Sequence, residues 1–133
     1  DIIQELIRQA VSAQEKAYAP YSNYRVGAAV LGESGKIYTG CNIENASFGA
    51  TVCAERTAIF KAVSEGEKKL LALALVGGDE SGISPCGICR QVMSEFSLSM
   101  PVYMAKADGS YEVMTVTELL PKAFTLSEGG APL

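Results

Sequence analysis

The cysteines of this chain have a spacing that suits metal ligands. The 133 residues include four cysteines and no histidine. Cys86 and Cys89 lie three residues apart at the start of an expected helix, so both sulfur atoms can face one ion. Cys53 lies 33 residues before Cys86, also at an expected helix start. The positive end of each helix dipole would lower the pKa of these thiols and favour metal binding.

The number of ligands distinguishes the kinds of metal site. A structural zinc ion usually has four protein ligands, whereas a catalytic zinc ion keeps one position open for water, so three cysteines favour catalysis. Cys41 lies on an expected strand outside the ligand spacing, and we expect it to be a small core residue. Two alternatives stay open: Cys41 as the fourth ligand of a noncatalytic zinc scaffold, and a redox pair of Cys86 and Cys89.

Charged residues beside the cysteines can complete a reaction centre. Glu55 is two residues from Cys53, a spacing that suits a carboxylate beside bound water better than a further ligand. A surface glutamate stabilised by the helix dipole is the alternative. Three thiolates around a dication leave a negative shell that a positive group must offset. Arg56 and Arg90 are placed to donate hydrogen bonds to the thiolates, although a surface salt bridge explains Arg90 equally well.

The elements that position these residues follow from hydrophobic periodicity and turn residues. Apolar positions predict an amphipathic helix over about the first eighteen residues, which Pro20 ends. The other expected elements are strands at 24–31 and 36–43 joined by a turn at 33–35, a helix at 52–64, a strand at 70–76, a helix at 85–96, strands at 101–105 and 111–116, and a helix at 117–120. This order predicts an α/β sandwich whose sheet begins antiparallel and continues through crossovers.

Length, composition and charge restrict the class of protein. The length and the 48% of hydrophobic residues predict a single globular domain over residues 1–133. The longest apolar run, residues 70–76, is too short to cross a bilayer, and no signal peptide is evident, so we expect a soluble intracellular protein. The net charge of −4, without a basic stripe, disfavours a nucleic acid polymer or a membrane and favours a small neutral substrate.

The metal motifs carry a family resemblance. Cys53-Ala54-Glu55 and Pro85-Cys86-Gly87-Ile88-Cys89 have the all-cysteine form of the zinc-deaminase signature. Segments similar to those of the small cytidine deaminases continue over nearly the full chain, at 19–22, 26–29, 40–45, 53–58, 84–91, 119–121 and Phe124. The sequence therefore resembles this family, which implies a three-layer αβα sandwich with a five-stranded mixed sheet.

The resemblance also implies an activity. It implies a hydrolase of pyrimidine salvage that acts on the C–N bond of a cyclic amidine, converting cytidine and 2′-deoxycytidine to uridine and 2′-deoxyuridine with release of ammonia. One Zn²⁺ per subunit would be held by Cys53, Cys86 and Cys89, with Glu55 as the catalytic acid and base and Arg56 beside the thiolates. A cytoplasmic homotetramer with sites at subunit interfaces is implied as well.

The substrate contacts come from the same resemblance. Asn42 and Glu44 match residues that hold the ribose hydroxyls, and their spacing would put both on one face of a strand. Without the resemblance, a solvated polar strand face would explain the pair. Tyr24 stands where the family commonly has Phe against the pyrimidine, Ala54 matches a residue whose backbone contacts the base, and Phe124 matches an aromatic that reaches the base from a neighbouring subunit.

Two positions depart from the family pattern, and other substrates are conceivable. Tyr24 adds a hydroxyl that needs a partner or solvent, and Phe48, where relatives often carry Tyr, lacks one; core packing is the alternative for both. Deaminases of the same fold could act on a nucleotide, an aminopurine or a nucleoside antibiotic. A nucleotide would require a phosphate site, and no Gly-rich loop with Lys or Arg is evident.

Overall fold

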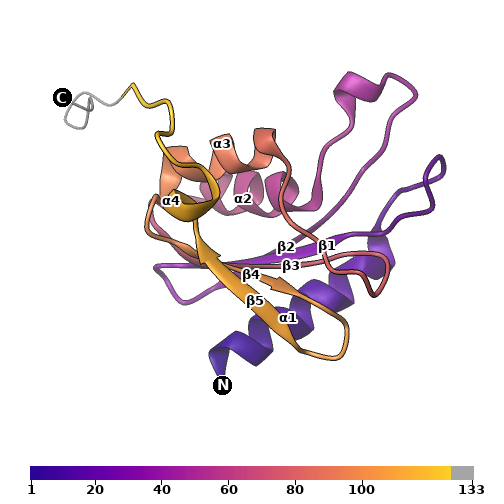
Figure 1. Ribbon diagram of the computed structural model, residues 1–133, viewed down its shortest axis with the longest axis horizontal. Helices are drawn as coiled ribbons and strands as arrows, with labels where there is room; N and C mark the ends of the chain where they lie inside the picture. Colours follow the sequence, from indigo (N-terminus) through magenta and orange to yellow (C-terminus); the bar gives the residue numbers. More distant parts are fainter. Residues whose placement is uncertain (127–133) are drawn as a thin grey trace.

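The computed structural model describes residues 1–126 and consists of helices packed on one mixed sheet (Figure 1). Its elements in chain order are α1 (Ile2–Ala13), the 3₁₀ turn η1 (Gln14–Lys16), β1 (Gly27–Gly32), β2 (Ile37–Cys41), the 3₁₀ turn η2 (Phe48–Ala50), α2 (Ala54–Ser64), β3 (Leu70–Val76), α3 (Gly87–Phe96), β4 (Pro101–Ala105), β5 (Tyr111–Thr115) and α4 (Val116–Leu119).

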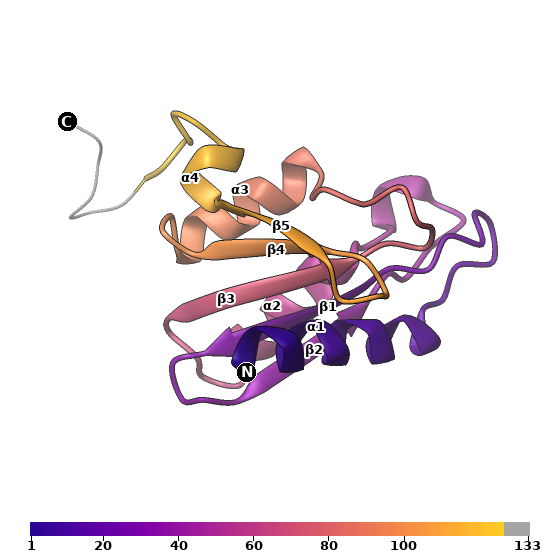
Figure 2. The same ribbon diagram turned by 60° about the horizontal axis from the view of Figure 1, so that its bottom comes forward.

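The five strands lie in the order β2-β1-β3-β4-β5. β1 is antiparallel to both β2 and β3, β4 and β5 are antiparallel, and β3 and β4 are parallel. α3 connects the parallel pair, because parallel neighbours cannot be joined by a tight hairpin. α1 covers one face of the sheet, and α2 and α3 cover the other (Figures 1 and 2). The expected three-layer αβα sandwich with a five-stranded mixed sheet is confirmed.

Successive side chains of the central strands point to opposite faces of the sheet, so the hydrophobic core has two parts, one on each face. On β1, Val30 joins the cluster under α2 and α3, whereas Ala29 joins the cluster under α1. α1 approaches β1 so closely that a methyl group at Gly27 would overlap the carbonyl oxygen of Ala10. Small residues on β1 thus allow the helix layer to sit directly on the sheet.

Local sequence signals located two strands correctly and misplaced the ends of three other elements. The strands at 70–76 and 101–105 are confirmed, but the first helix ends at Ala13 rather than near Pro20. The strand expected from residue 24 begins at Gly27, because the Asn42 side chain rather than a neighbouring strand bonds the Tyr24 carbonyl and the Val26 N–H. The strand expected to reach residue 43 ends at Cys41.

The helices beside the cysteines begin two residues later than expected. α2 begins at Ala54 rather than residue 52, and α3 begins at Gly87 rather than residue 85. Cys53 and Cys86 have extended backbone and are the N-caps of these helices. Each cysteine therefore lies at the N-terminus of a helix, where the first backbone N–H groups of the helix lack intrahelical partners.

The described helices are short. The longest, α1, has 12 residues, and its buried face comprises Leu6, Ile7, Ala10 and Ala13, which confirms the amphipathic pattern. A membrane-spanning helix needs about 20 predominantly apolar residues. Within residues 1–126, no helix has the length and apolar character to cross a bilayer.

Candidate metal centre and active site

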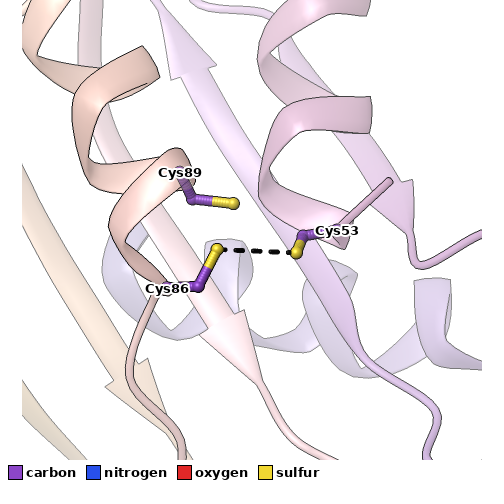
Figure 3. A group of neighbouring side chains, drawn as sticks. All are labelled: Cys53, Cys86 and Cys89. Atoms are coloured by element: carbon purple, nitrogen blue, oxygen red, sulfur yellow. Dashed lines mark hydrogen bonds between the residues drawn. The ribbon is translucent and has the colours of Figure 1, made fainter. Parts of the chain in front are cut away.

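Three cysteines meet where the N-termini of α2 and α3 come together (Figure 3). The sulfur atoms of Cys53, Cys86 and Cys89 all lie within 4.8 Å of one another. The Sγ atoms of Cys53 and Cys86 are 3.8 Å apart. Zinc–sulfur bonds of about 2.3 Å in tetrahedral geometry place two sulfur atoms about 3.8 Å apart. The separation of Cys53 and Cys86 thus suits two ligands of one zinc ion.

The local backbone presents these thiols to a common centre. Neither Cys53 nor Cys86 uses its side chain to cap its helix, so both sulfur atoms are free to bind a metal. Cys89 follows in the first turn of α3 and is fully buried, whereas Cys86 is exposed. Two helix N-termini direct partial positive charge toward the group, which stabilises thiolates.

Arg56 supplies the nearest full positive charge. Its Nη2 donates a hydrogen bond to the Sγ of Cys53 at 3.5 Å. The hydrogen bond from the Cys89 thiol, followed by that from Arg56, lowers the pKa of Cys53 to about 5. The interaction with Cys53, together with burial, raises the pKa of Cys89. The expected placement of Arg56 beside a thiolate is present in the structure.

The donor set suits a zinc ion. Three soft thiol ligands are typical of zinc sites, and an arginine beside them offsets part of the negative charge of a three-thiolate shell. The Nε of Arg56 is buried and is without a hydrogen-bond partner among the described residues. A buried cationic donor of this kind requires negative charge nearby, which three thiolates around a dication provide.

Glu55 is buried beside the cysteines in the first turn of α2. Its side chain is only 3% exposed, so it is not the surface glutamate of the alternative interpretation. Burial raises the pKa of Glu55 to about 7, and the charge of Cys53 adds to this rise. A carboxyl group with a pKa near neutrality can both accept and donate a proton, which is what acid–base catalysis requires.

Cys41 stands apart from the three-cysteine group. It is half-buried at the end of β2 and lines a separate cavity of about 390 Å³ together with Arg8 and Lys61. The group with metal-ligand geometry among residues 1–126 contains Cys53, Cys86 and Cys89 only. The structure therefore offers no support for Cys41 as a fourth ligand, and Cys41 is less buried than the core residue we expected.

Asn42 and Glu44 lie beyond the end of β2, so they do not share a strand face as expected. The Asn42 Oδ1 accepts from the Val26 N–H at 2.9 Å, and its Nδ2 donates to the Tyr24 carbonyl at 2.8 Å. The Glu44 carboxylate accepts from the N–H groups of Tyr21, at 2.9 Å, and Ser22, and from the Ser22 hydroxyl. Both side chains hold the turn that precedes β1.

Apart from Phe48, the residues around Glu44 have no individual role predicted from the sequence. A cavity of about 400 Å³ is lined by Tyr21, Ser22, Glu44, Asn45, Phe48 and Thr51. The hydrogen bond from the Ser22 side chain lowers the pKa of Glu44, so this carboxylate is ionised at neutral pH. The available sequence signal for these residues is the family-like segment Ala19-Pro20-Tyr21-Ser22.

The remaining expected contacts have different environments. Tyr24 packs against the core, and a methyl group at Gly77 would overlap its hydroxyl. Ala54 is fully buried at the first position of α2. Phe48 is 79% exposed and Phe124 is 68% exposed, so core packing does not explain Phe48. The backbone carbonyl of Phe124 accepts a hydrogen bond from Gln91 at 3.0 Å.

Arg90 contacts backbone rather than sulfur. Its Nε donates to the Pro85 carbonyl at 2.7 Å, and its Nη1 donates to the Leu119 carbonyl at 2.9 Å. Neither the expected hydrogen bond to a thiolate nor the alternative surface salt bridge is found for Arg90 in the described part of the chain. The Arg90 guanidinium donates to backbone carbonyls instead of to a thiolate or a surface carboxylate.

An αβα sandwich that brings together three thiols and a buried carboxyl group fits the class of zinc-binding hydrolytic enzymes. The family model described as "Cytidine and deoxycytidylate deaminase zinc-binding region" matches residues 1–105. The chain belongs to this family of deaminases, as the resemblance implied.

Individual relatives agree with this assignment. The chain is 53% identical over 124 residues to the cytidine deaminase of Sporosarcina psychrophila, covering 92% of this chain and 91% of the relative. It is 49% identical to the cytidine deaminase of Halalkalibacterium halodurans, covering 94% and 96%. The crystal structure of cytidine deaminase from Burkholderia pseudomallei superposes with a TM-score of 0.86 at 47% identity, covering 90% of this chain and 97% of that chain.

Proposed function

We propose that this protein catalyses the zinc-dependent hydrolytic deamination of cytidine and 2′-deoxycytidine to uridine and 2′-deoxyuridine, with release of ammonia. The observation that carries the proposal is the cluster of three cysteine sulfur atoms within 4.8 Å beside a 3% exposed glutamate. Relatives named cytidine deaminase, at up to 53% identity over nearly the whole chain, support the substrate. We place the reaction in cytoplasmic pyrimidine salvage.

Cys53, Cys86 and Cys89 would hold one Zn²⁺ per subunit through their sulfur atoms. When bound, zinc supplies Lewis acidity that lowers the pKa of a coordinated water toward about 7. With three protein ligands rather than four, the site would resemble catalytic zinc sites, which keep a position open for water. Arg56 would donate to the Cys53 sulfur, which withdraws negative charge from the ligand shell and favours deprotonation of the water.

Glu55 would be the catalytic acid and base. Its carboxylate takes a proton from the water that attacks C4 of the pyrimidine and delivers it to the ring nitrogen N3. It then transfers the second proton of that water to the exocyclic amine, so that the C4–N bond breaks and ammonia leaves. The burial that raises the pKa of Glu55 to about 7 makes both directions of transfer accessible at neutral pH.

Asn42 and Glu44 would bind the ribose hydroxyls. A side-chain amide has two donor hydrogens and two acceptor lone pairs, so the two hydrogen bonds of Asn42 leave capacity for a ligand. The ionised Glu44 retains acceptor capacity beyond its bonds to the 21–22 turn. Because the protein already orients both groups, a sugar would meet them with little rearrangement.

The base would be bound by Tyr24 through packing, by the backbone of Ala54 and by Phe124 of a neighbouring subunit. The large exposed side chains of Phe48 and Phe124 support an assembly in which they become covered, because aromatic residues are favoured in interfaces. We propose a homotetramer with active sites at the subunit interfaces.

The loss of cytidine absorbance on adding the zinc-loaded protein tests the activity, with CMP assayed in parallel. Rapid loss with cytidine and 2′-deoxycytidine but not with CMP is expected, because the proposed site has no identified group for a phosphate. Preferred turnover of CMP would identify a nucleotide deaminase instead. No turnover of any of the three compounds by zinc-loaded protein would contradict the proposal.

A further inference from the structure

The side chain of Arg90 holds the peptide group that precedes Cys86, whereas the first turn of α3 holds the peptide group that follows it. The Arg90 Nε donates to the carbonyl of Pro85, which belongs to the peptide group before Cys86, at 2.7 Å. The carbonyl of Cys86, which belongs to the peptide group after it, accepts the first backbone hydrogen bond of α3 from the N–H of residue 90 at 3.0 Å, whatever side chain residue 90 carries. Because each peptide group is planar, the helix restrains one side of Cys86 and the Arg90 side chain restrains the other.

The environment of Cys86 makes this restraint necessary. Cys86 is exposed, so side-chain packing does not hold it, whereas Cys89 is fully buried one turn later. Cys86 also makes no side-chain capping bond that would orient it. Pro85 is fully buried, and a buried carbonyl without a partner is costly. One hydrogen bond from the Arg90 guanidinium therefore gives the Pro85 carbonyl its partner and restrains the backbone of Cys86, the most exposed of the three cysteines.

A second contact anchors the guanidinium itself. The Nη1 of Arg90 donates at 2.9 Å to the carbonyl of Leu119, the last residue of α4. Carbonyls at the end of a helix lack intrahelical partners and accept from other groups. The guanidinium thus bridges the loop before α3 and the end of α4. A lysine ammonium cannot reproduce this planar fork of two donors in fixed directions.

We propose that Arg90 is a positioning residue of the metal centre, which orients Cys86 through its backbone so that the three sulfur atoms converge. Arg56 contacts a ligand sulfur directly, whereas the Arg90 side chain acts on a ligand through the carbonyl of the preceding residue. This inference rests on the proposed zinc site but not on the identity of the substrate.

The test compares zinc affinity in two matched arginine-to-lysine variants. Arg90→Lys is expected to weaken zinc binding 10- to 100-fold in competition with a chromophoric chelator, as loss of a group supporting a metal ligand typically does. Arg8→Lys, on α1 where Arg8 pairs with Glu5, is expected to bind zinc within twofold of the unaltered protein. If Arg90→Lys does not fold, Arg90→Gln enters the same assay.

A spectroscopic measurement separates ligand positioning from general destabilisation. In the Co²⁺-substituted proteins, the thiolate-to-cobalt and d–d absorption bands report the arrangement of the sulfur ligands. We expect these bands to change in Arg90→Lys and not in Arg8→Lys. Zinc affinity within twofold of the unaltered protein with unchanged cobalt bands would overturn the inference, even if thermal stability fell. Failure of the unaltered protein to bind zinc would instead overturn the metal centre, and with it the inference.

Discussion

Gly40 on β2 lies directly beneath Ala54, the first residue of α2. A methyl group at Gly40 would come within 2.6 Å of the Ala54 carbonyl oxygen and 2.5 Å of the Ala58 backbone nitrogen. Both atoms belong to backbone and cannot rotate away. The absence of a side chain at Gly40 therefore sets how closely the helix that begins after Cys53 approaches the sheet.

Substitution of Gly40 is expected to disturb both stability and metal binding. Gly40→Ala should lower the free energy of unfolding by about 1–3 kcal/mol, the usual cost of overpacking, and should weaken zinc binding because it displaces the start of α2. Gly49→Ala is the matched control, since a methyl group there meets no atom within 4 Å. Chemical denaturation and chelator competition measure the two effects. Equal stability of both variants would show that α2 adjusts without cost.

Removal of the Glu55 carboxylate should abolish turnover without loss of zinc. Glu55→Gln is expected to reduce kcat by about 10²–10⁴, the usual contribution of a positioned acid–base group. The zinc content should not change, because the three ligands are cysteines. Steady-state assays and metal analysis of the same preparation test this. Near-normal turnover by Glu55→Gln would refute the acid–base role.

Zinc stoichiometry should distinguish the four cysteines. The unaltered protein and Cys41→Ser are each expected to bind one zinc per chain, because Cys41 lies outside the three-cysteine group. Cys89→Ser should lose tight zinc binding, since a hydroxyl is a poor substitute for a thiolate. Metal analysis after dialysis against a weak chelator gives the result. Loss of zinc from Cys41→Ser would restore the four-ligand interpretation.

Glu44 should contribute to recognition of the sugar. Glu44→Gln is expected to raise KM for cytidine about 10- to 100-fold, since hydrogen bonds to charged groups are worth about 1.5–3 kcal/mol. Ser22→Ala removes one hydrogen bond to Glu44 but leaves the carboxylate, so its effect should be smaller. Kinetics of both variants measure the difference. Unchanged KM in Glu44→Gln would place the ribose elsewhere.

A second buried carboxylate should make stability depend on pH. Glu67 accepts hydrogen bonds from the Tyr38 hydroxyl at 2.9 Å and from Ser34, joining the β1–β2 turn to the segment before β3. The hydrogen bond from the Ser34 side chain lowers the pKa of Glu67 below its usual value. Because the pKa is lowered on folding, this stabilisation is complete above the unfolded pKa of about 4.3 and is lost as the pH falls through the folded pKa.

Neutralising Glu67 should remove this pH dependence. Glu67→Gln is expected to melt a few degrees below the unaltered protein at pH 7, and the difference should shrink as the pH falls below about 4. Glu65→Gln, at an exposed neighbouring position, is the control. Thermal unfolding followed by circular dichroism across this pH range gives the curves. A difference that does not vary with pH would show that packing, rather than charge, accounts for Glu67.

The sequence by itself determined the features that depend on short-range spacing. Cys86 and Cys89 are one helical turn apart, so their proximity needed only a helix near residue 87. The strands Leu70–Val76 and Pro101–Ala105 are apolar runs whose burial follows from their composition. The family motifs around Cys53 and Cys86 also sufficed to indicate a deaminase.

The tertiary structure alone decided which distant groups meet. Cys53 lies next to Cys86 and Cys89 because α2 and α3 pack on the same face of the sheet. No local sequence pattern specifies how close these two helices come. The burial of Glu55, which raises its pKa, likewise arises from surrounding elements. Arg90 was expected at a thiolate or in a surface salt bridge, but it binds the carbonyls of Pro85 and Leu119. Backbone carbonyls are present at every residue, so only packing determines which of them face an arginine.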